Sequence, residues 1–236
     1  PLRFDQLLVG KQVLGVSRRG KNILIELSDQ LTLWVHLKMT GHFFWVSRTE
    51  AVEKHDLVIL DLADSTHHLR FNDYRRFGRL RLFRADELWQ QKGLAELGPE
   101  PLEITATQFI EICHRCPRQI KQALLDQSFI AGIGNIYADE SLYYSRIHPQ
   151  RLTTSLSRLK LTELHGHIQR LLSRAIRLHG TSVDTYSGVN GRTGSFQKHL
   201  LAYGHDGEPC NRCGTAIRRE KIGSRSAHFC PRCQQK

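Results

Sequence analysis

Two cysteine pairs, Cys210-Asn-Arg-Cys213 and Cys230-Pro-Arg-Cys233, are spaced C-x2-C-x16-C-x2-C near the end of the chain. Two thiolate pairs on tight turns, joined by a short hairpin, form a tetrahedral site for one zinc ion. The insert 214–229 has too few apolar side chains for a core of its own, so the metal would supply most of the folding free energy of this module. Two disulfides are the alternative, but the chain shows no secretory signal and cytosolic thiols stay reduced.

Composition and charge narrow the class of protein. The chain has 236 residues, of which 40% are hydrophobic, enough for one large domain or two small ones beside the zinc module. It has no long apolar run, so we expect no membrane span. The 34 Lys and Arg against 23 Asp and Glu give a net charge of +11, which favours nucleic acid as the partner. A merely basic or ribosome-like surface is the alternative.

Residues 10–83 show the alternation and the turn residues that are typical of β-structure. Short strands at roughly ten-residue spacing predict a β-sandwich or a β-barrel. The expected strands are 13–17, 22–27, 31–37, 42–46, 56–62 and 79–83.

The pattern becomes helical after Gly98-Pro-Glu-Pro101, whose two prolines mark a linker. Apolar residues at helical spacing predict a long amphipathic helix over 156–178 that ends at Gly180. Shorter helices are expected at 105–113, 120–126 and 136–144. We therefore predict an α+β multidomain protein with a β-sandwich at 1–98, a helical domain at 103–203 and a zinc finger at 204–236.

The turn Gly132-Ile-Gly-Asn135 joins two of the expected helices. Its glycines permit positive φ, and the helix that follows points free backbone N–H groups and the positive end of its dipole outward. Such a turn suits a DNA phosphate, with Asn135 as an additional side-chain donor. Taken alone, a turn of this type is as often purely structural.

A longer stretch contains this turn: Ser128-Phe-Ile-Ala-Gly-Ile-Gly-Asn-Ile-Tyr-Ala-Asp-Glu-Ser-Leu142. It resembles the helix–two-turn–helix motif of the bacterial formamidopyrimidine-DNA glycosylase and endonuclease VIII family. Further stretches stand where that family has its markers, among them His36-Leu-Lys-Met-Thr-Gly41, Asp73-Tyr-Arg-Arg-Phe-Gly78 and Gly223-Ser-Arg-Ser-Ala-His-Phe-Cys230. The resemblance covers nearly the whole chain and implies a β-sandwich, a helical domain and a β-hairpin zinc finger.

The resemblance implies roles for individual residues. Met39, Arg75 and Phe77 are similar to three side chains that fill the gap left when a damaged nucleotide is flipped out of the duplex. Without the resemblance, Met39 and Phe77 would be interpreted as ordinary core. Lys21 looks like the lysine that serves as acid in β-elimination, and Arg225 like the fingertip arginine that grips phosphates and assists δ-elimination.

The resemblance implies that other residues bind DNA phosphates, cover the excised base or support the helical domain. Glu140 matches a carboxylate that supports the helical domain, and Arg192 lies in the loop that covers the excised base. A solvated surface charge is the alternative interpretation of Lys21 and of Arg225. Phosphate contacts are implied for His55, Arg76, Lys121 and Asn135.

The beginning of the chain departs from the family. The family begins Pro-Glu-Leu-Pro-Glu, and its N-terminal proline amine attacks the sugar C1′. This chain begins Pro1-Leu-Arg-Phe-Asp5, so we expect the first helix and strand, with the catalytic segment, to be absent. Three interpretations follow: a truncated form of an active enzyme, which we favour, a natural DNA-binding paralogue, or an enzyme in which Pro1 still acts.

The expected activity is base-excision repair. The resemblance implies a DNA glycosylase and AP lyase that removes oxidised purines such as 8-oxoguanine and formamidopyrimidines, by β,δ-elimination, from double-stranded DNA. One zinc ion is expected to be structural, and the protein to be a monomer in the bacterial cytoplasm, associated with the nucleoid. The alternative is a non-catalytic, zinc-dependent binder of damaged or flexible DNA. A plain zinc-ribbon RNA-binding protein is a third interpretation.

Overall fold

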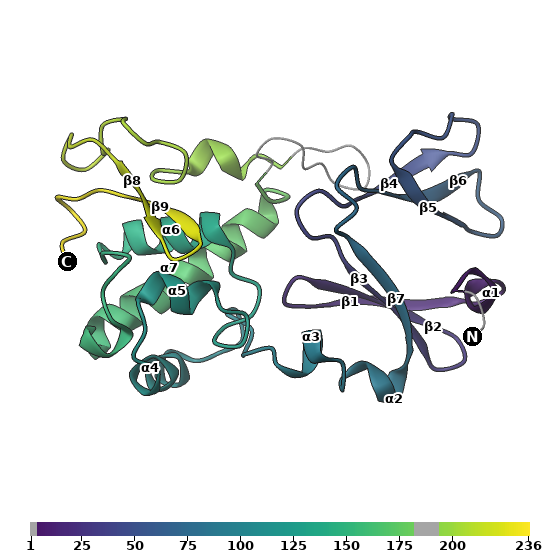
Figure 1. Ribbon diagram of the computed structural model, residues 1–236, viewed down its shortest axis with the longest axis horizontal. Coiled ribbons are helices and arrows are strands. Elements are labelled where there is room, and N and C mark those ends of the chain that lie inside the picture. Colours follow the sequence, from purple (N-terminus) through teal and green to yellow (C-terminus); the bar gives the residue numbers. More distant parts are fainter. Residues whose placement is uncertain (1–3, 182–193) are drawn as a thin grey trace. The chain divides into compact units, whose positions relative to one another are not determined.

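The computed structural model describes residues 4–181 and 194–236 (Figure 1). The chain divides into two compact units, Pro1–Ala95 with Leu178–Gln197, and Glu96–Arg177 with Lys198–Lys236. The division near residue 95 falls close to the linker expected at Gly98-Pro-Glu-Pro101. The zinc module and most of the expected helical domain lie in the second unit, so the boundary expected between them stays a prediction.

Two antiparallel sheets form most of the first unit. The larger sheet has the strand order β1-β2-β3-β7, and the smaller one has the order β4-β6-β5. All the strands expected from the sequence are present. The bounds are β1 Val13–Arg19, β2 Asn22–Leu27, β3 Leu31–His36, β4 His42–Ser47, β5 Asp56–Asp61, β6 His67–Asn72 and β7 Arg79–Arg84.

The core of this unit lies between the two sheets. Leu33 and Val35 on β3 pack in one cluster with Phe43 on β4 and Phe71 on β6. The rings of Phe43 and Phe71 meet edge to face at 5.4 Å between centroids. Because each fully buried side chain of this size stabilises the fold by about 1.5–3 kcal/mol, the shared core holds the sheets together. The expected β-sandwich is therefore confirmed.

Strand β6 was not expected from the sequence, because its residues His-His-Leu-Arg-Phe-Asn are mostly polar. The structure places it at the centre of the smaller sheet. Arg70, only 3% exposed, donates to the carbonyls of Ala51 (2.7 Å) and Glu50 (2.6 Å) and to Asp56 (3.1 Å). These acceptors make it possible to bury a guanidinium in a central strand.

Helices build the second unit around one apolar cluster that includes Phe109, Ile130, Leu142 and Leu164. Thr105 begins helix α4 with a capping box, in which its hydroxyl accepts from the backbone N–H of Gln108. The helix bounds along the chain are α1 Phe4–Leu8, α2 Ala85–Leu88, α3 Lys92–Ala95, α4 Ala106–Arg115, α5 Ile120–Leu125, α6 Asn135–Tyr144 and α7 Arg158–Arg177, with short 3-10 turns at Thr153–Ser155 and Phe196–His199.

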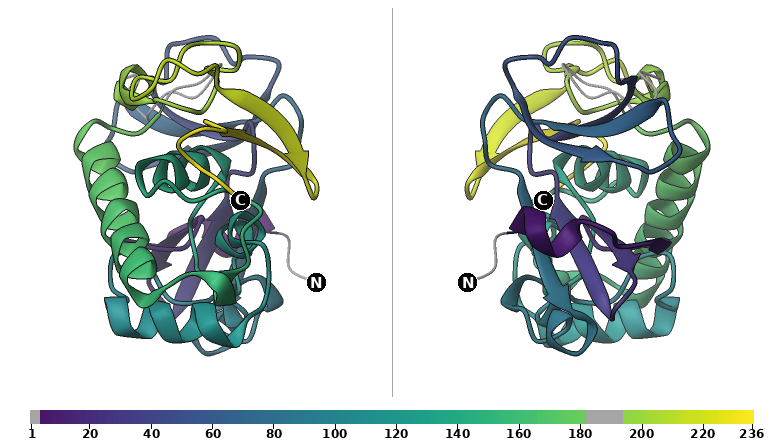
Figure 2. Two further views of the ribbon diagram at one scale, coloured as in Figure 1. Left: turned by 90° about the vertical axis from the view of Figure 1, so that its left-hand side faces the viewer. Right: turned by 90° about the vertical axis from the view of Figure 1, so that its right-hand side faces the viewer.

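A β-hairpin completes the second unit. Its strands β8, Arg218–Ile222, and β9, Arg225–Phe229, pair antiparallel, and Gly223 makes the tight turn with φ of 62°. Helix α6 contacts both α7 and the hairpin (Figure 2). The fold is thus a β-sandwich, a helical domain and a zinc-finger hairpin, as expected.

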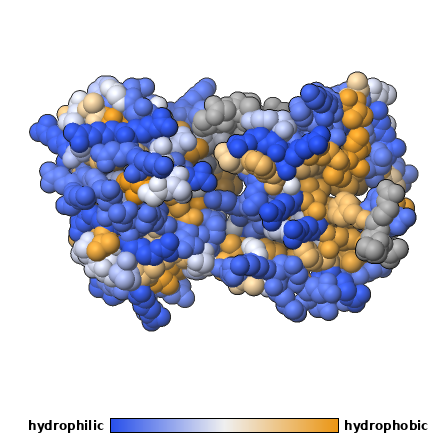
Figure 3. Space-filling model, in the orientation of Figure 1, coloured by the Kyte–Doolittle hydropathy of each residue, from blue (hydrophilic) through white to orange (hydrophobic). Residues whose placement is uncertain are grey.

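The surfaces of the two units differ in character. Hydrophilic side chains cover most of the second unit on the face shown in Figure 3, whereas hydrophobic surface is exposed over the first unit. Strand β1 contributes exposed Leu14 and Val16 to the apolar surface of that unit. Among the helices in the described ranges, none is long and apolar enough to cross a membrane.

Candidate metal centre and nucleic-acid interface

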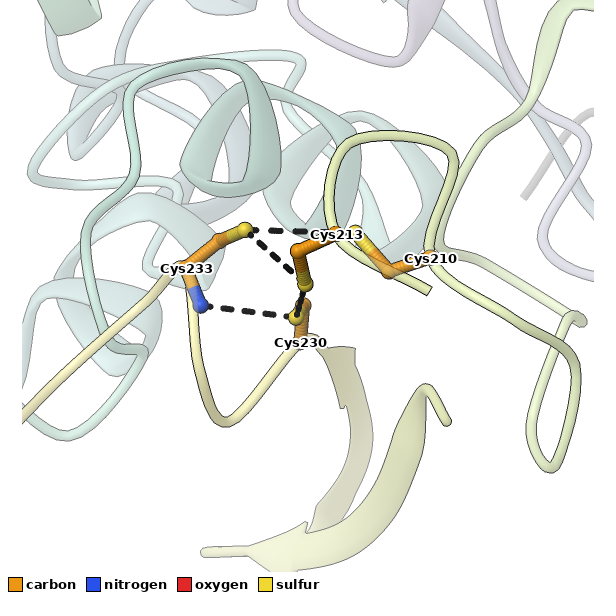
Figure 4. Close-up of side chains that lie close together, drawn as sticks. All are labelled: Cys210, Cys213, Cys230 and Cys233. Carbon is orange, nitrogen blue, oxygen red and sulfur yellow. Dashed lines mark hydrogen bonds between the residues drawn. The ribbon is translucent and has the colours of Figure 1, made fainter. Parts of the chain in front are cut away.

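The four cysteines of the two pairs converge on one point (Figure 4). Their sulfur atoms all lie within 4.8 Å of one another, with Cys213–Cys230 and Cys213–Cys233 at 3.5 Å and Cys210–Cys233 at 4.0 Å. A tetrahedral zinc ion with Zn–S bonds of about 2.3 Å separates its sulfurs by about 3.8 Å. All six cysteines, which fall within the described ranges, are free thiols. The cluster therefore fits one structural zinc ion.

Hydrogen bonds shape the two turns that carry Cys210–Cys213 and Cys230–Cys233, which we call the first and second zinc knuckles. The carbonyl of Cys210 accepts from the N–H groups of Cys213 (3.2 Å) and Gly214 (2.8 Å), which closes the first turn. Hydrogen bonds from Thr215 lower the pKa of the Cys213 thiol, whereas burial raises the pKa of Cys230 and of Cys233, so those two thiols would lose their protons to bind zinc. The side chain of Gln234 accepts from the Cys230 N–H and donates to the Ile147 carbonyl, both at 2.9 Å, and so ties the second knuckle to the helical part.

In the first unit, the three expected void-filling side chains lie together. The guanidinium of Arg75 lies 3.6 Å from the Met39 sulfur, and its central carbon is 4.8 Å from the centroid of the Phe77 ring. Met39 is 63% exposed and Phe77 is 52% exposed. The alternative interpretation of these two side chains as core is therefore wrong. We call Met39, Arg75 and Phe77 the exposed trio.

A buried carboxylate supports the exposed trio. Asp73, with no exposed surface, accepts from the Thr40 hydroxyl (2.5 Å) and from the N–H groups of Arg75 (3.2 Å) and Gly78 (2.6 Å). Burial alone would raise the pKa of Asp73, but these hydrogen bonds outweigh it and hold the pKa below its usual value. This supporting role of Asp73 has no local signal in the sequence, although Asp73 opens one of the stretches that resemble the family's markers.

The expected phosphate ligands His55 and Arg76 lie close to the exposed trio in the structure: Arg76 is part of the loop that begins at Asp73, and His55 is hydrogen-bonded to Asp73. The carbonyl of His55 accepts from the Asp73 N–H at 3.0 Å, and its ring meets that of Tyr74. Arg76 is exposed and has a positive φ of 56°. The structure thus groups both residues with the exposed trio.

Lys21 is exposed in the two-residue turn between β1 and β2. Burial and the charges of Lys38, Lys21 and Arg79 lower the pKa of His36 to about 4. His36 is therefore neutral at physiological pH, and its Nδ1 accepts from the Lys38 N–H at 2.9 Å. This arrangement places a cluster of cations at the end of β3, just before the loop that carries Met39.

In the second unit, the turn before α6 is organised by one glutamine. Gln127 accepts from the Gly132 N–H (2.9 Å) and donates to the carbonyls of Leu125 and Ile133 (both 3.1 Å). Gly132 has the expected positive φ of 82°, whereas Gly134 is extended. The buried Oδ1 of Asn135 has no hydrogen-bond partner among the described residues. Asn135 is the first residue of α6, so it lies at the helix N-terminus where an anion ligand is expected, and its side-chain N–H groups, not Oδ1, are what an anion would accept from.

The two basic residues expected in this unit differ in position. Arg225 is exposed at the tip of the hairpin, opposite Ile222. Lys121 is fully buried instead; its ammonium donates to Asp139 and to the carbonyl of Ser226 (2.6 Å). The structure therefore places Lys121 inside the unit, where it joins α5 to α6 and the hairpin, and not at the surface where a phosphate would reach it.

Glu140 has the supporting position that the resemblance implied. It is fully buried, and its carboxylate accepts from the backbone N–H groups of Leu201, Ala202 and Tyr203 at 2.8–3.1 Å. The carboxylate thereby holds the segment that leads into the first zinc knuckle.

Three sequence profiles match the chain. The formamidopyrimidine-DNA glycosylase N-terminal domain matches residues 1–80, and the formamidopyrimidine-DNA glycosylase H2TH domain matches residues 97–187. The zinc finger found in FPG and IleRS matches residues 207–236. Because the first profile matches from residue 1, the expectation that the N-terminal catalytic segment is absent is not borne out. Pro1 itself, and Arg192 of the expected base-covering loop, lie outside the described residues.

Whole-length comparisons agree with the profiles. The formamidopyrimidine-DNA glycosylase of Pelotomaculum thermopropionicum is 43% identical over 98% of this chain and 84% of its own length. That of Pediococcus pentosaceus is 45% identical over 98% of this chain and 84% of its own length. Among solved structures, a complex between the Lactococcus lactis Fpg and an abasic-site DNA is similar with a TM-score of 0.91 and 39% identity, over 99% of this chain and 87% of that one. A complex between a mutant of the Lactococcus lactis protein and a Fapy-dG containing DNA has the same TM-score of 0.91 at 38% identity, over 99% of this chain and 87% of that one.

Proposed function

From the premise that the chain belongs to the formamidopyrimidine-DNA glycosylase family, we propose that it excises oxidised purines from duplex DNA and then cleaves the strand. The observation that carries this proposal is the exposed trio held by buried Asp73. The apolar side chains of Met39 and Phe77 are exposed beside the guanidinium of Arg75 and do not contribute to a packed core. Such a group suits the gap that a flipped nucleotide leaves in the duplex.

The proposed first step is extrusion of the damaged nucleotide. Unstacking a base from the duplex costs a few kcal/mol, and inserted side chains offset part of this cost. Met39 and Phe77 offer apolar surface to the neighbouring bases, and Arg75 offers hydrogen-bond donors to the base left without its partner. Because Arg75 already contacts both of its neighbours in the trio, little side-chain entropy is lost when the three enter the helix.

The proposed chemistry needs an amine nucleophile. The amine attacks the sugar C1′, the N-glycosidic bond breaks, and the base leaves with a proton, so that a Schiff base joins protein and sugar. β-Elimination then breaks the bond to the 3′ phosphate, and δ-elimination breaks the bond to the 5′ phosphate. We assign Lys21 as an acid and Arg225 as a fingertip phosphate ligand in these steps, since Lys21 is exposed in the β1–β2 turn and Arg225 is exposed directly after the β8–β9 turn.

Zinc has a structural role in this proposal. Four thiolates would fill its tetrahedral coordination and leave no open position for water or substrate. The ion instead would hold the two knuckles from which the β8–β9 hairpin extends, and so would place Arg225. His55, Arg76 and Asn135 are the proposed phosphate ligands, and we expect the protein to act as a monomer at the bacterial nucleoid.

The test is borohydride trapping of the zinc-loaded protein on three duplexes. One duplex contains a single 8-oxoguanine, one contains an abasic site, and one is undamaged. We expect covalent adducts on the first two and none on the third, because a stable adduct forms only where borohydride reduces a Schiff base between the protein and a sugar C1′. Arg75→Ala should reduce the adduct on 8-oxoguanine, whereas Arg84→Ala, a change of an exposed arginine at the end of β7, should not.

Two other outcomes would contradict the proposal. Salt-sensitive binding to the abasic duplex without any adduct would indicate the non-catalytic binder of damaged DNA. Equal affinity for all three duplexes and for RNA, again without an adduct, would indicate a plain zinc-ribbon nucleic-acid binder.

A further inference from the structure

The hydroxyl of Tyr143 touches the metal centre. Tyr143 lies at the end of helix α6 with no exposed surface, and it packs in one cluster with Ala202, Cys210, Ile217 and Cys230. Its hydroxyl oxygen is 3.3 Å from the sulfur of Cys210. A buried phenol needs a hydrogen-bond partner, and here the partner is a zinc-ligating sulfur.

The direction of this hydrogen bond follows from the protonation states. A cysteine that binds zinc does so as a thiolate and has no proton to donate. A tyrosine keeps its proton at neutral pH. With zinc in the site, the Tyr143 hydroxyl therefore donates and the Cys210 sulfur accepts.

Arg212, between the first two cysteines, holds the Tyr143 ring in place. Its guanidinium carbon lies 4.4 Å from the centroid of the Tyr143 ring and 5.8 Å from that of Tyr144. The same guanidinium donates to the carbonyls of Tyr143 (2.7 Å) and Tyr144 (3.3 Å). A cation on the last carbonyls of a helix satisfies acceptors that have no partner within the helix. Arg212 of the first zinc knuckle thus caps the C-terminal end of α6, and the Tyr143 side chain of α6 in turn contacts Cys210 of that knuckle.

We propose that Tyr143 is a positioning residue of the metal centre, whose hydroxyl donates to the Cys210 thiolate and so slows both the release of zinc and the attack of electrophiles on that sulfur. A hydrogen bond to a ligand atom orients the ligand and stabilises its charged form, and loss of such a partner typically weakens metal binding about 10–100-fold. Because α6 begins at Asn135, the same contacts tie the metal to the helix that presents this residue. The proposal rests on the zinc site and does not require glycosylase activity.

The chain offers a matched pair of variants. Tyr143→Phe removes the hydroxyl and leaves the ring under Arg212. Tyr144→Phe makes the same chemical change in the next residue, whose ring contacts the same guanidinium but whose hydroxyl is not bonded to a cysteine in the described residues. Any general effect of losing a tyrosine hydroxyl beside the knuckle should appear in both variants.

The experiment measures zinc release from the full, zinc-loaded chain into excess 4-(2-pyridylazo)resorcinol. We expect release about tenfold faster for Tyr143→Phe, in line with the cost of losing a hydrogen-bond partner of a metal ligand, and within about twofold of the parent for Tyr144→Phe. Reaction of the cysteines with a thiol reagent should accelerate in the same order. Equal release rates for the parent and both variants, or equal acceleration in both variants, would overturn the proposal.

A spectroscopic readout separates the hydrogen bond from a general loosening of the fold. With Co²⁺ in place of zinc, the sulfur-to-cobalt charge-transfer band should shift in Tyr143→Phe and stay in place in Tyr144→Phe. If Tyr143→Phe does not fold, Arg212→Lys serves instead, since it keeps the charge but loses the planar fork that covers the ring. We expect faster zinc release from that variant, and an unchanged rate would again contradict the proposal.

Discussion

The buried carboxylate of Asp73 accepts the hydroxyl hydrogen of Thr40 across 33 positions of sequence, at 2.5 Å. Thr40 follows Met39 directly, and the loop that begins at Asp73 carries Arg75 and Phe77. One carboxylate therefore joins the two loops that carry the exposed trio, and each of its oxygens is occupied by a donor from this loop system.

Asp73→Asn should lower the free energy of unfolding and, because Asp73 holds the exposed trio, the affinity for lesion-containing DNA. An amide replaces one acceptor oxygen by a donor, which then faces either the Thr40 hydroxyl or the Gly78 N–H. We expect a loss of about 1–3 kcal/mol in the free energy of unfolding, as for a buried polar group left unpaired. Denaturant unfolding measures this loss. Asp86→Asn, at a carboxylate whose side chain is 76% exposed, is the control and should stay within about 0.5 kcal/mol.

Gly78→Ala should destabilise the first unit because a Cβ there would overlap the Phe71 ring and lie 3.0 Å from an Asp73 oxygen. Overpacking of this kind costs about 1–3 kcal/mol. Gly93→Ala is the control, since its Cβ would meet only the Trp34 ring at 3.6 Å and alanine favours helix α3. Thermal melting of both variants checks this prediction, and equal melting temperatures would show that the Phe71 ring gives way.

Arg76→Ala should weaken binding to lesion-containing and undamaged duplexes alike. An exposed arginine that neutralises one phosphate releases counterions, so its loss should reduce the slope of log K against log salt by about 1. Affinity measured at a series of salt concentrations tests this. Arg84→Ala, also an exposed arginine of the first unit, should leave the slope unchanged. A selective loss of affinity for one lesion would instead indicate that Arg76 reads a base.

Asp126→Asn should change how the stability of the protein depends on acid. Arg118 donates to Asp126 at 2.5 Å, and Ser128 adds two more hydrogen bonds, which together lower the pKa of Asp126 to about 2. A lowered pKa in the folded state means that the carboxylate stabilises the fold above the pKa of the unfolded chain, about 3.9, and loses that contribution as the pH falls toward 2.

For a carboxylate that is partly exposed, we expect this contribution to be on the order of 1 kcal/mol. The parent should therefore exceed Asp126→Asn in free energy of unfolding at pH 7, and the difference should shrink between about pH 4 and pH 2. Urea unfolding across this pH range measures the difference. If the difference in free energy of unfolding persisted at pH 2, the amide would be destabilising the turn by something other than the loss of the carboxylate charge.

Several features of the fold were open to prediction because their signals are local. The spacing of the four cysteines predicted the zinc cluster, since two short turns can present thiolates with no help from the rest of the chain. Alternation predicted the strands of the sandwich except β6, whose buried Arg70 depends on carbonyls of Glu50 and Ala51 that lie about twenty positions earlier. A polar strand of this kind has no local signal.

The sequence by itself determined which residues are available for chemistry, namely the metal-binding thiols and the basic turn residues. It also indicated most of the strands and helices. Only the tertiary structure decided which side chains reach the surface. Met39 and Phe77 have apolar side chains, yet they are exposed because buried Asp73 holds their loops outward. Lys121 is a cation, yet it is buried because Asp139 and the Ser226 carbonyl take the place of water around its ammonium. Burial is set by partners that are distant in sequence, and a local pattern does not contain them.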